Sequence, residues 1–172
     1  MQLFANWLKR EIFDAMFRYP VMKTLCLLFS LTLLTASAAD KPYDESANAK
    51  RDIQQALATA ANKPVVVVFG ANWCPDCLVL DRSMNEGASA KLLKQDFKIV
   101  KVDVGRQDKN VELAASYGVH VTNGIPAVVI LSPKSEIIYA TKDAELSKAR
   151  SMGDDGIYQF FKRATASIKK QE

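Results

Sequence analysis

Residues 65–77 read VVVVFGANWCPDC: five apolar, mostly β-branched residues, a glycine, and two cysteines separated by two residues. The apolar run 65–69 predicts a buried strand, and helical spacing follows at Leu78, Leu80, Asp81 and Met84. The stretch therefore places Cys74 and Cys77 at the beginning of a helix. Pro75 suits the first helical position, because the N–H that proline lacks would have no partner there.

The position of the cysteine pair indicates redox chemistry. The first turn of a helix has unpaired N–H groups and the positive end of the dipole, so it stabilises an anion. A cysteine there loses its proton more easily, and only the thiolate attacks disulfides. We therefore expect Cys74 to be accessible and to attack, and Cys77 to face inward one turn later.

Two other interpretations of the pair are a zinc half-site and an inert structural disulfide. Zinc needs about four ligands, and the chain otherwise offers one cysteine, Cys26, and one histidine, His120. A bridge that closes so short a loop stabilises little on the loop-closure argument. The sequence therefore favours a redox-active pair over a metal site, and it indicates no cofactor.

The stretch resembles the active site of the thioredoxin superfamily, in which a strand leads to Trp-Cys-x-x-Cys and a helix. Residues 117–119 read YGV and residues 124–130 read GIPAVVI. In thioredoxins a similar pair of motifs precedes a strand, and its proline is cis and faces the cysteines. The resemblance covers roughly residues 52–166. It implies a thioredoxin-like α/β fold, with a mixed central sheet sandwiched by helices, and substrate binding at Ile125 and Pro126.

The resemblance also implies how the two cysteines work. Cys74 opens a substrate disulfide and forms a mixed disulfide, and Cys77 then displaces the substrate and leaves a Cys74–Cys77 bridge. The reverse sequence oxidises a substrate. Trp73 and Pro75 flank the first cysteine and are expected to tune the site.

The chain departs from thioredoxins at two places near the site. Thioredoxins carry a buried aspartate six residues before the first cysteine, where this chain has Val68, so the internal base is missing unless water or another carboxylate substitutes. Lys101 matches the family's lysine on the neighbouring strand, although an exposed lysine at a strand end is the alternative. Residues 121–123 are an apparent insertion after His120. The His120 side chain either stabilises a thiolate or is a solvated loop residue.

Asp76 lies between the cysteines and bears on the direction of electron flow. Its negative charge opposes a neighbouring thiolate and is expected to raise the cysteine pKa, weakly if the carboxylate is exposed. Strong oxidants and isomerases of the family often have histidine there. The sequence therefore favours a reductase, or an isomerase kept reduced, over a strong oxidase.

The beginning of the chain predicts export. Residues 22–39 combine a positive start, a short apolar run and an Ala-x-Ala step, as in a secretory signal, with cleavage after Ala38 or Ala39. Cys26 would leave with it. Residues 1–21 do not fit such a signal. They are either an over-extended reading frame, which we favour, or an amphipathic segment at a membrane. The predicted domain is then residues 40–172.

Charge and composition agree with one exported domain. Of the net charge of +4, residues 1–39 supply four basic and two acidic residues, so +2 remains beyond them. That excess is too small to suggest nucleic-acid binding. The expected partners are protein substrates with disulfides or thiols, together with an upstream reductant or oxidant. The protein is expected to be periplasmic or otherwise exported and to be a monomer. Its only expected contact with the membrane is through the signal.

A binding module is the alternative function: a thioredoxin-like domain that docks a partner, delivers copper through its thiolates, or relays electrons to cytochrome maturation.

The remaining pattern predicts the order α-β-α-β-α-β-β-α. The first elements are helix 49–61, strand 65–69, and a helix from Pro75 that breaks or bends at 86–89, with a further turn over 90–95. Strand 97–104, helix 108–117 capped by Asp108, hairpin 127–131 and 136–141, and a helix from Asp154 or Asp155 follow.

Overall fold

The computed structural model describes residues 41–142 and 144–168. The predicted signal at 22–39 and the segment 1–21 lie outside these residues, so the predicted domain boundaries stay predictions. Within the described part of the chain, none of the helices combines the length and the apolar character that crossing a membrane requires.

A four-stranded mixed sheet forms the centre of the domain, in the order β2-β1-β3-β4. β1 (Val65–Gly70) runs parallel to β2 (Lys98–Asp103) and antiparallel to β3 (Ala127–Leu131), and β3 pairs antiparallel with β4 (Ile137–Ala140). All six residues of β1 are buried. The unbroken apolar run therefore forms a strand that is covered on both faces.

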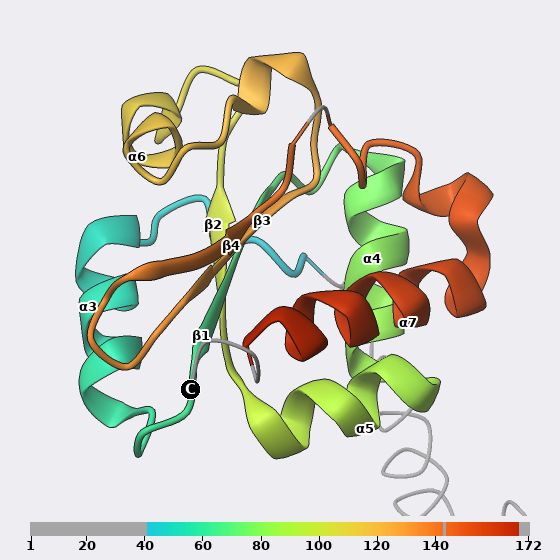
Figure 1. Cartoon of the computed structure of the whole chain (residues 1–172). Coiled ribbons are helices and arrows are strands. Elements are labelled where there is room, and N and C mark those ends of the chain that lie inside the picture. Colours follow the sequence, from blue (N-terminus) through green and yellow to red (C-terminus); the bar gives the residue numbers. More distant parts are fainter. Residues whose placement is uncertain (1–40, 143, 169–172) are drawn as a thin grey trace, which may run out of the picture. The chain divides into compact units, whose positions relative to one another are not determined.

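Helices cover both faces of the sheet. α3 (Ala49–Thr59) and α6 (Val111–Ser116) lie on one side, whereas α4 (Pro75–Asn85), α5 (Gly87–Asp96) and α7 (Ala149–Ile168) pack together on the other (Figure 1). This arrangement confirms the predicted α/β fold class. It places α4 and its cysteines at the carboxyl end of β1.

The predicted break after the active-site helix is confirmed. Glu86 has extended backbone angles between α4 and α5, although α5 begins at Gly87 and is longer than the predicted 90–95.

The predicted cap at Asp108 is wrong. Asn110 precedes α6, and the Asp108 carboxylate instead accepts the Arg106 N–H at 2.8 Å, a side-chain turn that competes with capping.

The last helix contains an extra segment that the pattern did not predict. Gly153 interrupts α7 with non-helical angles of φ 64° and ψ 176°. The segment after Gly153 begins at Asp154, as predicted, and buries Ile157, Phe160, Phe161 and Ala164. The segment before it carries Arg150, which contacts the active-site helix.

Candidate active site

The cysteine pair begins α4, as the sequence predicts. β1 ends at Gly70, a three-residue loop follows, and Cys74 is the N-cap of α4, with Pro75 in the first turn. The Cys74 Sγ atom accepts the Cys77 backbone N–H at 3.3 Å, so the sulfur occupies the place that a capping oxygen usually takes. Both cysteines are free.

Cys74 is less accessible than predicted, since the residue is only 5% exposed. Its thiol donates to the Ile125 carbonyl oxygen, with 3.7 Å between sulfur and oxygen. The Ile125–Pro126 peptide bond is cis, as the resemblance implies. The loop before β3 therefore lies against the attacking sulfur and leaves little of it open to solvent.

The two thiols differ in acidity. The pKa of Cys74 is lowered from 9.0 to about 7, chiefly because the Cys77 thiol donates a hydrogen bond to its sulfur. Burial acts in the opposite direction, whereas the backbone N–H groups of Cys77 and Asp76 lower the pKa further. The same hydrogen bond, together with burial, raises the pKa of Cys77 well above its ordinary value. Near neutral pH the first sulfur is partly a thiolate, while the second keeps its proton.

Asp76 is buried and paired, unlike the exposed acid considered from the sequence. Its carboxylate accepts the Arg150 backbone N–H at 2.9 Å and the Arg150 guanidinium at 3.1 Å. The Asp76 charge does raise the pKa of Cys74, as predicted, but it is the smallest of the causes. Arg150, 74 positions away, is a residue that sequence reasoning missed.

Lys101 forms an ion pair with Asp81 of α4, and both side chains are largely buried. This excludes the exposed strand-end lysine. In the register of the sheet Lys101 lies opposite Val68, the position at which thioredoxins carry their aspartate. A carboxylate therefore does lie near this strand position, but it comes from the active-site helix.

Trp73 is anchored away from the helix. The side chain is 47% exposed, its indole N–H donates to the Gly105 carbonyl oxygen at 2.6 Å, and the Arg106 guanidinium lies 5.8 Å from the ring centre. The loop after β2 therefore holds the indole, and about half of the residue stays exposed.

The apparent insertion forms a short 3-10 helix, Val121–Asn123, ahead of the cis-proline loop. His120 before it is exposed and lines a surface pocket with Asn123, Gly124 and Thr141. Neither cysteine lines that pocket. The structure thus brings Cys74, Cys77, Asp76 and Ile125 together, while it leaves His120 on the surface.

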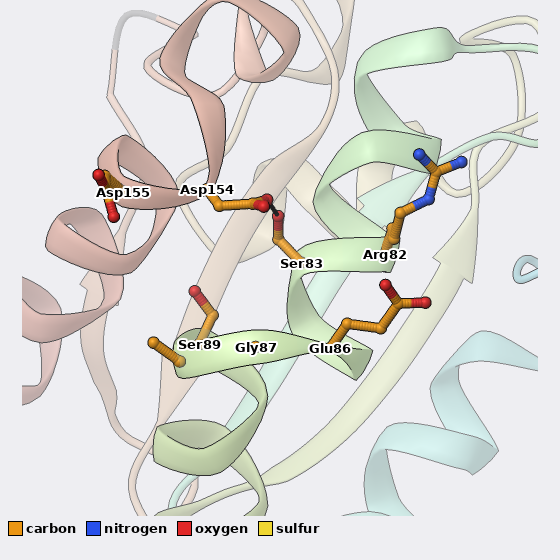
Figure 2. Close-up of a pocket in the computed structure, with 8 residues that line it drawn as sticks. Arg82, Ser83, Glu86, Gly87, Ser89, Asp154 and Asp155 are labelled. Atoms are coloured by element: carbon orange, nitrogen blue, oxygen red, sulfur yellow. Dashed lines mark hydrogen bonds between the residues drawn. The ribbon is translucent and has the colours of Figure 1, made fainter.

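A second pocket lies between α4, α5 and α7 and is shown in Figure 2. The Ser83 hydroxyl donates to the Asp154 carboxylate at 2.5 Å across it, so it links α4 to the second segment of α7. Neither cysteine lines this pocket. In the described residues no group of three or more His, Cys, Asp or Glu side chains is arranged to hold a metal ion.

Comparisons with known proteins agree with this geometry. A family model described as thioredoxin-like matches residues 47–133. The chain belongs to the thioredoxin-like family. A curated thioredoxin from Mycoplasmoides gallisepticum is 39% identical over 80 residues, which are 46% of this chain and 69% of that protein.

One solved structure is closely similar to this thioredoxin-like protein. It is the crystal structure of a disulphide isomerase from Xylella fastidiosa Temecula1, with 45% identity and a TM-score of 0.71 over 74% of this chain and 99% of that one. Together with the Cys-x-x-Cys pair, these similarities support a thioredoxin-like thiol–disulfide oxidoreductase.

Proposed function

We propose that this oxidoreductase is exported and that it reduces or isomerises the disulfides of protein substrates through Cys74 and Cys77. The observation that carries the proposal is the contrast between the two sulfurs. Cys74 caps a helix with a pKa of about 7, and its neighbour Cys77 is buried with a raised pKa. A reactive thiolate next to a protected thiol suits sequential attack and release.

The proposed cycle begins with the reduced pair. The Cys74 thiolate attacks one sulfur of a substrate disulfide, so that a bond forms between Cys74 and the substrate while the substrate's own S–S bond breaks. The departing substrate sulfur takes a proton from water. The Cys77 sulfur, once deprotonated, attacks Cys74 and releases the second substrate sulfur. The substrate gains two electrons, and the protein is left with a Cys74–Cys77 bridge.

The acidity of Cys74 supports a reducing rather than a strongly oxidising couple. Thioredoxin has an attacking cysteine with a pKa near 7, whereas that of the strong periplasmic oxidant DsbA is about 3.5. A strong oxidant owes its strength to a highly stabilised reduced thiolate. A pKa of about 7 for Cys74 supports the proposed reducing role.

The substrate chain is proposed to bind beside the cis proline. Ile125 and Pro126 lie at the beginning of β3, and the Ile125 carbonyl oxygen is already within reach of Cys74. An extended substrate segment would pair with this backbone in the manner of an added strand, with its disulfide next to the attacking sulfur. The exposed face of Trp73 offers apolar contact on the neighbouring loop.

Reduction of insulin followed by turbidity tests the proposal. The wild-type protein with dithiothreitol is expected to accelerate precipitation of the insulin chains, and Cys74→Ser is expected to abolish the acceleration. Cys77→Ser is expected to accumulate a mixed disulfide that mass spectrometry detects. If the wild-type protein does not accelerate precipitation but binds Cu(I) through both thiolates, the proposed function is wrong and copper binding takes its place.

Export is tested separately. A fusion of residues 1–39 to a reporter that is active only outside the cytoplasm is expected to give signal, and deletion of residues 22–39 is expected to remove it. Reporter activity that survives the deletion would contradict the predicted secretory signal.

A further inference from the structure

A polar pocket adjoins the loop at which the substrate is proposed to bind. Gly124 and Ala127, which flank Ile125 and Pro126 in the chain, both line it. Its volume is about 250 Å³. A protein cavity of about 150 Å³ already holds a benzene molecule, so this pocket has room for one side chain. It lies next to the backbone along which the substrate segment is proposed to run.

The apparent insertion, residues 121–123, builds part of this pocket. His120 precedes the inserted 3-10 helix and Asn123 ends it, and both residues line the pocket. Val121 is fully buried, and its carbonyl oxygen accepts the Gln107 side-chain amide at 2.7 Å. These contacts hold the inserted turn against the domain. The insertion therefore gives the pocket two polar side chains at fixed places, and the two cysteines leave it without a role so far.

The segment after β4 supplies another wall. Thr141 is buried, and its hydroxyl oxygen accepts the Val128 N–H at 3.1 Å. The oxygen thus takes one hydrogen bond from the sheet and keeps its own proton for a second partner. Gly124 packs closely on the same segment, because a Cβ atom there would lie 2.9 Å from the Cβ atoms of Ala144 and Ser147. The segment and the cis-proline loop therefore form one continuous surface.

The polar groups of the pocket are mainly hydrogen-bond donors. Lys142 lines it, is exposed, and takes part in none of the ion pairs of the described residues. His120 and Asn123 offer N–H groups beside it. Lys101 and Arg150, by contrast, are each paired with a carboxylate of α4. Since no described residue of the pocket lining is acidic, the pocket suits a ligand with negatively charged acceptor oxygens.

We propose that this pocket is a specificity subsite for the side-chain carboxylate of an aspartate or glutamate that lies within two residues of the substrate cysteine. The Ile125 carbonyl oxygen is 3.7 Å from the Cys74 sulfur, and Gly124 of the pocket is the next residue along the loop. An extended segment advances about 3.3 Å per residue, so a residue one or two positions from the substrate cysteine comes to the pocket. The carboxylate accepts from the Lys142 ammonium and from the neighbouring N–H and O–H groups.

This inference rests on the proposed function and adds the class of substrate: proteins with an acidic residue next to the disulfide. The test uses peptides that contain one disulfide and carry glutamate at one of the two positions on either side of a cysteine. Each has a partner peptide with glutamine at that position. Full-length reduced protein is mixed with excess peptide, and its oxidation is followed by acid quenching and intact-mass spectrometry.

Each rate constant is divided by that for reduction of the same peptide by dithiothreitol, which removes the effect of the glutamate on the disulfide itself. At low ionic strength the wild-type protein is expected to favour glutamate over glutamine by about fivefold to tenfold at one or more of the positions. The preference should shrink in about 1 M NaCl, where the Debye length is only about 3 Å.

Lys142→Met removes the charge and keeps a long unbranched side chain, so the preference for glutamate is expected to fall to about twofold or less. Lys142→Glu should instead favour peptides with lysine at that position. Asn123→Ala, which removes a donor without changing the charge, should weaken the preference for glutamate. Lys134→Met is the matched control, because Lys134 is exposed in the turn between β3 and β4, and it should keep the wild-type preference.

Two results would overturn the inference. One is a wild-type protein that does not distinguish glutamate from glutamine at any of the positions, and the other is a preference that Lys142→Met leaves unchanged. A wild-type protein that reduces none of the peptides would instead overturn the proposed function.

Discussion

At the residue scale, the acidity of Cys74 depends first on its neighbour. The thiol of Cys77 donates to the Cys74 sulfur, and this hydrogen bond is the largest cause of the lowered pKa. The helix start adds backbone N–H groups, which act in the same direction. The reactive thiolate is therefore a property of the pair and not of one cysteine alone.

Alkylation with iodoacetamide should follow this pKa. In reduced protein the rate of Cys74 modification is expected to rise with pH and reach half of its maximum near pH 7, because only the thiolate reacts. Peptide mapping should find Cys77 unmodified over the same range. Cys77→Ala removes the thiol donor and should move the midpoint towards 9. An unchanged midpoint in that variant would assign the low pKa to the helix start instead.

The ion pair between Asp76 and Arg150 predicts two opposite shifts in redox potential. Asp76→Asn removes a negative charge near Cys74, so it should lower the Cys74 pKa and raise the potential. Arg150→Gln leaves the carboxylate uncompensated and should do the reverse. Each shift is expected to be a fraction of the 30 mV that corresponds to about 1.4 kcal/mol for two electrons, because the Arg150 side chain is 60% exposed and water screens its charge.

Equilibration with glutathione, followed by Trp73 fluorescence or by alkylation and mass, measures both variants. Arg51→Gln is a control, since Arg51 is exposed and pairs with Asp52 on α3, on the other face of the sheet. Shifts of the same sign in the two active-site variants would contradict the electrostatic explanation. A wild-type potential like that of the strong oxidants would contradict the proposed reducing role.

At the scale of the element, α4 must keep its register on the sheet for the site to form. Leu80 is fully buried between the cysteines and the end of the helix, whereas Leu78 on the same helix is only half-buried. The buried side chain therefore anchors α4, and its neighbour two positions earlier serves as a matched control.

Leu80→Ala should lower the free energy of unfolding by about 2–5 kcal/mol, because it removes buried contacts and leaves a cavity. Leu78→Ala makes the same chemical change and should cost clearly less. Urea denaturation of both variants measures the difference. Equal losses would mean that α4 is not anchored through Leu80.

At the scale of the whole molecule, the predicted leader at residues 22–39 is expected to be removed on export. Intact mass of the exported protein is expected to show a chain that begins at Ala39 or Asp40. Expression from Met1 and from Met22 should give the same mature mass. A mature mass that retains residues 1–21 would reject the start at Met22.

The sequence by itself determined the features that depend on neighbours along the chain. The run of valines predicted β1, the spacing after it predicted α4, and Pro75 marked the first helical turn. The Gly-Ile-Pro motif, through a family resemblance, predicted the cis peptide bond at Pro126. These signals were sufficient because strand burial and helix initiation are expressed in residues within one or two turns of each other.

Only the tertiary structure decided which charges surround the cysteines. Asn72 reaches Tyr43 across 29 positions, and Asp76 reaches Arg150 across 74. Lys101 of β2, which lies opposite Val68 in the sheet, forms an ion pair with Asp81 of α4. No local pattern encodes such partners, because they meet only when the sheet pairs and the helices pack on it, and the low-dielectric interior then makes each pairing matter.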